Sequence, residues 1–184
     1  MIMYIAIYSD TVHRMEQELF ELAHKDHLTG LHNRRHMMRI LRAFIEDEEK
    51  EKFAIAMMDV DYFKNVNDTY GHDAGDKVLK SLAEILKEES KNNEAINPGR
   101  WGGEEFLLVL SDYNGNKEEI MASLEALRKR VEEKIICHEE QEIRITVTVG
   151  VAFYESGLSL NELLKAADDK LYEGKEGGRN KVVW

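Results

Sequence analysis

The feature that most constrains this chain is the run Phe53–Met58, in which every residue is apolar. An uninterrupted apolar run of this length predicts a buried central strand. The run leads directly into Asp59-Val60-Asp61, so acidic residues follow the strand without a break. Carboxylates at the mouth of a buried strand are either solvated charges or part of a metal site, and the rest of the chain discriminates between these two interpretations.

A second acidic pair lies in the stretch Arg100–Leu110, written RWGGEEFLLVL. Two glycines and two glutamates precede the apolar run Phe106–Leu110, which predicts a tight turn followed by another strand. Taken alone, this pattern favours a plain hairpin with solvated acids. Its combination with Asp59 favours a metal site, because the strand ending at Asp59 and this hairpin are expected to be neighbours in one sheet.

The chemistry of these residues fits magnesium. Carboxylate oxygens suit Mg²⁺, which accepts a few protein ligands and leaves positions for substrate phosphates. Gly102 and Gly103 allow a sharp turn and let a phosphate approach the backbone. Two such ions about 4 Å apart activate an attacking oxygen and stabilise a leaving one.

The remaining pattern predicts an α+β domain whose core follows the order βαββαβ, with flanking helices packed on one face of the sheet. A polar turn is expected after Lys64, and a turn-rich segment from Asn92 to Gly99. Further helices are predicted around Met37–Ile45, Val78–Leu86, Ile120–Ile135 and Leu160–Tyr172, and further strands over Ile143–Gly150 and Lys181–Trp184.

Residues 1–25 carry a separate pattern. Apolar residues alternate at spacings of three and four, as in a heptad seam, and are Ile5, Tyr8, Val12, Met15, Leu19 and Leu22. We therefore expect an N-terminal helical segment, residues 1–25, followed by a domain over residues 26–184. The seam either pairs two chains or docks on its own domain, and we favour dimerisation.

Composition excludes several classes of function. A net charge of −11 argues against binding nucleic acid, which needs a basic surface. The lone Cys137 fits a reducing compartment. The opening run Met1–Tyr8 is too short to span a bilayer and has no basic region before it. We expect a cytoplasmic protein or the cytoplasmic part of a membrane-anchored one, whose input signal comes from a longer protein or from another chain.

Four motifs in order resemble the GGDEF-domain diguanylate cyclases, and the resemblance runs from Asp26 to Val182. Gly102-Gly103-Glu104-Glu105-Phe106 is similar to the family signature in its GGEEF form. The other three are Asp26-x-Leu28-Thr29-Gly30-Leu31-x-Asn33-Arg34-Arg35, Asp59-x-Asp61-x-Phe63-Lys64-x-x-Asn67-Asp68-x-x-Gly71-His72-x-x-Gly75-Asp76, and Lys175-x-x-Gly178-Arg179-Asn180.

The resemblance implies synthesis of cyclic di-GMP from two GTP molecules by two facing subunits, with two Mg²⁺ ions per active site and Mn²⁺ as a substitute. It implies that Asp59, the Val60 carbonyl, Glu104 and Glu105 bind the metal, and that Glu104 takes the 3′-hydroxyl proton, a role it shares with Glu105. Asn67 and Asp76 would read the guanine edge, because an acidic side chain accepts hydrogens that adenine does not offer. The phosphates would be held by Phe63, Lys64, Lys175 and Arg179, with His72 lining the site.

Other interpretations stay open beside this one. The chain is alternatively an inactive receptor for GTP or a cyclic dinucleotide, or a cyclase that makes a mixed or adenine-containing product. Many family members also carry an Arg-x-x-Asp product site, but Asn93-Glu94-Ala95-Ile96 stands there, so product feedback is in doubt. His32 and His36, with His24 and His27 upstream, offer a weaker zinc interpretation, and surface or capping histidines are the default.

Overall fold

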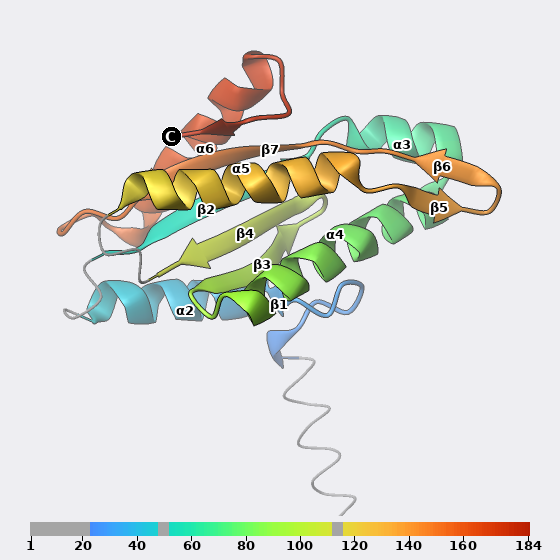
Figure 1. The fold of residues 1–184 in the computed structure, drawn as a ribbon. Coiled ribbons are helices and arrows are strands. Elements are labelled where there is room, and N and C mark those ends of the chain that lie inside the picture. The colour runs from blue at the N-terminus through green and yellow to red at the C-terminus, as the bar shows by residue number, and fades with distance from the viewer. Residues whose placement is uncertain (1–22, 48–51, 112–115) are drawn as a thin grey trace, which may run out of the picture.

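The computed structural model describes residues 23–47, 52–111 and 116–184 (Figure 1). The heptad positions between Ile5 and Leu22 therefore lie outside the described residues. The helices are α2 (Arg34–Glu46), α3 (Phe63–Tyr70), α4 (His72–Asn92), α5 (Lys117–Glu133) and α6 (Leu160–Glu176). The strands are β1 (His32–Asn33), β2 (Ala54–Val60), β3 (Ile96–Gly102), β4 (Glu105–Leu110), β5 (Ile136–His138), β6 (Gln141–Ile143), β7 (Val147–Phe153) and β8 (Val182–Val183).

The main sheet has six strands in the order β1-β3-β4-β2-β7-β8, and β5 and β6 form a separate hairpin. β2 lies inside the sheet and pairs antiparallel with both β4 and β7, while β1 with β3 and β7 with β8 are parallel. All seven residues of β2 are buried. This arrangement confirms the central strand predicted from the apolar run.

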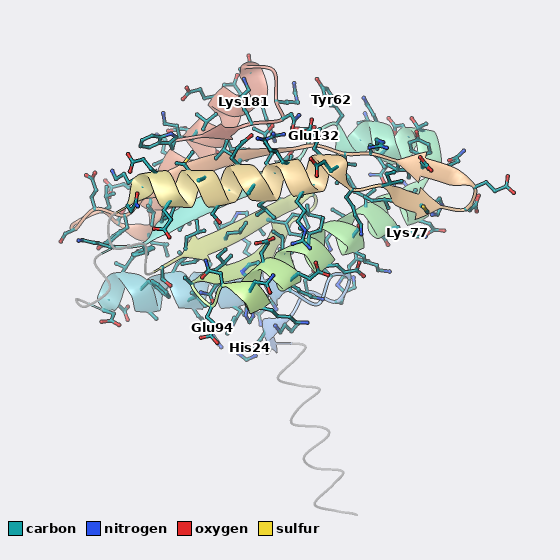
Figure 2. All side chains as sticks on the ribbon, viewed as in Figure 1. His24, Tyr62, Lys77, Glu94, Glu132 and Lys181 are labelled. Atoms are coloured by element: carbon teal, nitrogen blue, oxygen red, sulfur yellow. The ribbon has the colours of Figure 1, made fainter. Side chains whose placement is uncertain are left out.

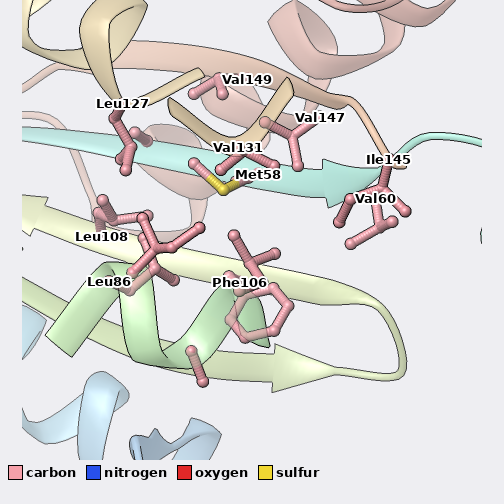
Figure 3. Packing of buried hydrophobic residues seen from close by; sticks show 14 of the residues in the cluster. Met58, Val60, Leu86, Phe106, Leu108, Leu127, Val131, Ile145, Val147 and Val149 are labelled. Carbon is pink, nitrogen blue, oxygen red and sulfur yellow. The ribbon is translucent and has the colours of Figure 1, made fainter. Parts of the chain in front are cut away.

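Helices cover both faces of the sheet, so the expectation that they pack on one face was wrong. Ala54, Ala56 and Met58 of β2 belong to a core that α4 and α5 cover. Ile55 and Met57 belong to a second core that α2 and α6 cover. Figure 3 shows the first of these cores, in which Leu86 of α4 and Leu127 of α5 pack over Met58 and Leu108. A strand that is apolar on both faces needs both covered, because each buried side chain contributes about 1.5–3 kcal/mol.

Local capping sets where several helices begin. The Asn33 side chain accepts a hydrogen bond from the backbone N–H of His36 at the start of α2. Ser159 and Glu162 form a reciprocal capping box at the start of α6. These caps satisfy backbone donors that the first helical turn leaves unpaired.

Three further predictions need correction. The segment predicted to be turn-rich up to Gly99 contains β3, which begins at Ile96, and the polar turn expected after Lys64 is the helix α3. The strand expected over Ile143–Gly150 is divided between β6, which ends at Ile143, and β7, which runs from Val147 to Phe153. For β3, pairing with β4 outweighs the turn propensity of its own residues.

None of the helices within the described ranges has the length and the hydrophobicity needed to cross a bilayer.

Candidate active site

The two acidic segments meet where β2 ends and β4 begins. β2 and β4 are antiparallel, and their register places Asp59 directly opposite Glu105. Glu104 lies in the turn between β3 and β4, and its carbonyl accepts a hydrogen bond from the Val60 N–H at 3.4 Å. The prediction that Asp59 and the Glu104-Glu105 hairpin are neighbours is confirmed.

Asp59 lies in a strongly charged and largely dry environment. Its side chain is 9% exposed, and its Oδ2 lies 2.9 Å from Nζ of Lys175 on α6. Burial raises the pKa of Asp59, and the nearby charges of Glu104 and Glu105 add to this rise, while the hydrogen bond and charge of Lys175 oppose it. One lysine therefore faces three carboxylates, which makes a further cation electrostatically favourable here.

The described residues fit a metal that also takes ligands from a substrate. No three His, Cys, Asp or Glu side chains within the described ranges are grouped closely enough to hold a metal ion by themselves. Asp59 and Glu105 nevertheless face each other across one ladder and offer only oxygen donors, as Mg²⁺ prefers. An ion bound by so few side chains would need phosphate, water or backbone oxygens to complete its coordination.

The glycine turn between β3 and β4 is held by a hydrogen bond from Arg100, and the space next to its two glycines is open. Gly103 has a positive φ of 53°, which favours glycine. The carbonyl of Gly103 accepts a hydrogen bond from Nε of Arg100 at 2.9 Å, and Nη1 of Arg100 lies 3.1 Å from Oδ1 of Asp26. A Cβ added at Gly102 or Gly103 would meet no atom within 4 Å, so their outer side is free for a ligand to approach.

The N-terminus of α3, which two residues separate from the end of β2, is a candidate anion site. Tyr62 precedes it in the left-handed conformation, with φ 55°, and provides no side-chain cap. Within the described residues no group accepts a hydrogen bond from the N–H of Phe63 or Lys64, whereas Asn65 donates to the Tyr62 carbonyl at 2.8 Å. The guanidinium of Arg179 lies 4.7 Å from the centre of the Tyr62 ring. Free N–H groups beside a cation bind phosphate well.

Asn67 and Asp76 come from neighbouring helices. A Cβ on Gly75 of α4 would lie 2.0 Å from Oδ1 of Asn67 on α3, so the absence of a side chain at Gly75 lets the amide approach α4. Asp76 follows directly and is exposed, as are His72 at the start of α4 and Lys64 on α3. The polar groups predicted to contact the base and the phosphates are therefore accessible.

Sequence reasoning missed two supporting residues of this site. The sequence assigned no role to Asp61 beyond its place in a motif. In the structure Asp61 is 4% exposed and accepts hydrogen bonds from the hydroxyls of Thr146 and Thr148 at 2.7 and 2.6 Å. Tyr62 carries no sequence signal for its left-handed backbone, because non-glycine residues seldom adopt it. The Asp-x-Asp pattern was the one available indication for Asp61.

A cavity of about 580 Å³ beside α3 is lined by none of the predicted site residues. Tyr62 and Glu132, both labelled in Figure 2, are among its lining residues. Its two carboxylates are already bonded, since Asp61 accepts from two threonines and Glu132 pairs with Arg128. The carboxylate chemistry therefore places the candidate active site at Asp59 and Glu105 rather than in this cavity.

Three of the upstream histidines contact each other. The ring centroids of His24 and His32 lie 4.8 and 4.3 Å from that of His36. Burial lowers the pKa of His32 to about 4 and also lowers the pKa of His36. The side chain of His27 is 90% exposed. The lowered pKa values favour the neutral imidazole at His32 and His36. Within the described ranges, no group of three His, Cys, Asp or Glu side chains that could hold a metal ion includes these histidines.

At the position of the Arg-x-x-Asp product site, this chain has a buried apolar residue and no cation. Ile96 is 3% exposed at the start of β3, and Asn93 is the C-cap residue that follows α4. Both residues line a cavity of about 160 Å³ whose lining also contains Glu119 but no lysine or arginine. An acidic lining without cations is unfavourable for a phosphate.

Residues 23–181 match the family described as "Diguanylate cyclase, GGDEF domain". The chain is 39% identical over 172 residues to Diguanylate cyclase A of Treponema denticola, covering 90% of this chain and 45% of that protein. It is 35% identical over 182 residues to the response regulator PleD of Caulobacter vibrioides, covering 96% of this chain and 39% of that protein. The chain thus spans less than half the length of these curated relatives.

Solved structures show the same fold. The coiled coil and GGDEF domain of DgcB from Caulobacter crescentus, in complex with c-di-GMP, has a TM-score of 0.84 at 30% identity, covering 98% of this chain and 96% of that one. Diguanylate cyclase SiaD from Pseudomonas aeruginosa, in complex with its activator SiaC, has a TM-score of 0.82 at 36% identity, covering 99% of this chain and 71% of that one.

Proposed function

Because the chain belongs to the GGDEF family of diguanylate cyclases, we propose that it condenses two molecules of GTP into cyclic di-GMP and releases two pyrophosphates. The observation that carries this proposal is the pairing of Asp59 with Glu105 beside an uncapped helix N-terminus. Carboxylates and anion-binding groups meet there at one point, which is the combination that metal-assisted phosphoryl transfer needs.

Asp59, the Val60 carbonyl, Glu104 and Glu105 are the residues that would hold two Mg²⁺ ions, or Mn²⁺ in their place. When bound, the ions supply charge stabilisation at the α-phosphate and lower the pKa of the attacking hydroxyl. The protein's own contribution begins with Lys175, whose ammonium now pairs with Asp59 at 2.9 Å. Binding of a cation at Asp59 would free Lys175 to contact the phosphates instead.

The nucleotide's phosphates would lie across the start of α3. The N–H groups of Phe63 and Lys64 lie at the uncapped start of this helix, and the guanidinium of Arg179 lies 4.7 Å from the ring centre of Tyr62, the residue before it. These groups fix the position of the triphosphate, and alignment of this kind provides much of the rate enhancement when two substrates react.

Guanine would be recognised between α3 and α4. Asn67 lies against Gly75, and Asp76 is the next residue of α4, so an amide and a carboxylate come from adjoining helices. His72, one turn earlier on α4, lines the same side. A carboxylate accepts hydrogens from N1 and N2 of guanine, which adenine does not provide.

Each subunit would hold one GTP. In two facing subunits, the 3′-hydroxyl of each GTP would attack the α-phosphate of the other. Glu104 would take the proton from the attacking hydroxyl, a role shared with Glu105 because a metal-bound glutamate is a poor free base. We propose a homodimer that residues 1–25 help to form. These residues also provide the connection to any upstream sensor domain.

Product identification tests this proposal. Purified protein is incubated with Mg²⁺ and with GTP, ATP or both, and the products are separated by chromatography and identified by mass. We expect cyclic di-GMP and pyrophosphate from GTP alone. Binding of GTP without any product would instead show an inactive receptor, and a mixed or adenine-containing product would show a different cyclase.

A further inference from the structure

Two consecutive residues near the C-terminus adopt a backbone conformation that side chains disfavour. Arg179 has φ 64° and Asn180 has φ 48°, directly after Gly178 at φ 102°. Glycine and asparagine tolerate the left-handed region, but arginine has no such preference. Strained conformations of this kind persist only where the surrounding structure holds them, and they concentrate at functional sites.

Asn180 is held through its backbone N–H and through both the nitrogen and the oxygen of its side-chain amide. Its backbone N–H lies 3.0 Å from Oδ2 of Asp61 and 3.1 Å from Oγ1 of Thr148. Its side-chain amide donates to Glu132 at 2.8 Å, and its side-chain oxygen accepts from Arg128. Asn180 is therefore fixed to three elements, because these partners come from the end of β2, from β7 and from α5.

Asp61 is the buried centre of this arrangement. Its carboxylate accepts from Thr146, Thr148 and the Asn180 N–H, and within the described residues it has no ion-pair partner. Burying a carboxylate to 4% exposure costs free energy, and these hydrogen bonds offset part of that cost. We call Asp61, Thr146, Thr148 and Asn180 the Asp61 network.

Arg179 adjoins the Asp61 network through the chain and makes two further hydrogen bonds of its own. Arg179 directly precedes Asn180 in the chain. The backbone N–H of Arg179 donates to the Gly174 carbonyl at 2.9 Å, and Nη1 of Arg179 donates to the Lys175 carbonyl at 3.2 Å. The guanidinium then lies over Tyr62, one residue before the N-terminus of α3. We propose that Asp61 and Asn180 are positioning residues, which hold Arg179 in its left-handed conformation so that the guanidinium meets the phosphates bound at α3.

This inference rests on the proposed function, because it assigns the nucleotide's phosphates to Arg179, but its test needs no turnover. The probe is α,β-methylene GTP with Mg²⁺, which cannot be condensed, and its affinity is measured by calorimetry. The variants are Asn180→Ala, Asp61→Asn and Arg179→Ala, with Thr148→Val as a milder change should Asp61→Asn not fold. Glu125→Gln is the matched control, because Glu125 bonds Arg128 but does not contact Asn180.

We expect Asn180→Ala to weaken binding about tenfold, nearly as much as Arg179→Ala, since each loses one charge-assisted contact. In the Arg179→Ala background, Asn180→Ala should change affinity less than about twofold, because the positioned group is already absent. Asn180→Gly should lose less than Asn180→Ala, since glycine adopts the left-handed backbone without the steric cost that alanine has. Glu125→Gln should bind like the wild type.

Two results would overturn the inference. One is wild-type affinity in folded Asn180→Ala and Asp61→Asn variants. The other is an Asn180→Ala effect that is equally large with and without Arg179, which would show that Asn180 acts independently of Arg179. A wild-type protein that binds the probe but makes no cyclic di-GMP from GTP would remove the proposed function and leave the positioning role intact.

Discussion

Asp76 lies exposed on α4, next to the glycine against which Asn67 packs, and in the proposed site it is the carboxylate that accepts hydrogens from guanine. We expect Asp76→Ser to reduce the preference for GTP over ATP by about tenfold or more, because a hydrogen bond to a charged group contributes about 1.5–3 kcal/mol. The measurement is kcat/KM for each nucleotide. An unchanged ratio between the two nucleotides would show that the base is recognised by other residues.

The residues at the family's product site lead to a second prediction. Asn93 and Ile96 replace an arginine and an aspartate, and Ile96 is buried in β3. Added cyclic di-GMP is therefore expected to leave initial rates nearly unchanged at concentrations that saturate typical product sites. Initial-rate assays across a range of product concentration measure this. Strong non-competitive inhibition that survives substitution of Asn93 and Ile96 would reveal another product site.

At the scale of elements, the contact between α3 and α4 positions the base-binding residues. Gly75→Ala would place a methyl group 2.0 Å from Oδ1 of Asn67 and so displace the amide. We expect KM for GTP to rise about tenfold, as for the loss of one hydrogen bond of about 1.4 kcal/mol. Ser90→Ala, near the other end of α4, is the control and should leave KM unchanged. A Gly75→Ala variant with normal KM would mean that Asn67 does not contact the nucleotide.

Elements with a clear apolar pattern were predictable, and elements that depend on partners were not. The run Phe53–Met58 predicted β2 because all of its residues are apolar, and a segment of this kind is buried wherever it lies. The same run also indicates that both faces of β2 are covered, an implication that the one-face prediction overlooked. β3 contains Asn97, Pro98 and Gly99, which favour turns, and it is a strand because it pairs with β4. No local signal could have shown this.

The site divides in the same way. Asp59, Glu104 and Glu105 were identified by residue type and position, since oxygen ligands at strand ends have a recognisable chemistry. Asp61 and Tyr62 were not, because their roles come from contacts with β7 and Arg179, which are distant in sequence. Sequence patterns therefore indicate which groups do chemistry better than which groups hold them in place.

At the scale of the whole molecule, the proposed reaction takes only half of its reacting atoms from one domain. Specific activity should therefore rise with enzyme concentration if residues 1–25 pair weakly, because linking two domains raises their effective concentration. Replacing Met15 and Leu19 of the heptad seam with charged residues should lower activity in dilute solution without unfolding the domain. Activity per molecule is measured over a wide dilution range for both proteins. A flat profile that both proteins share would show that the seam does not form the dimer.

The most direct test of the account is the turnover of GTP by Glu105→Gln beside the wild type, as a function of Mg²⁺. Glu105 faces Asp59 across the β2–β4 ladder, and the change removes charge while keeping shape. We predict that Glu105→Gln folds normally and loses at least about 100-fold in kcat, since it removes a ligand of the catalytic metal. Glu142→Gln on the exposed part of β6 should retain full activity. Near-normal formation of cyclic di-GMP by folded Glu105→Gln would contradict the metal site and leave a plain hairpin in its place.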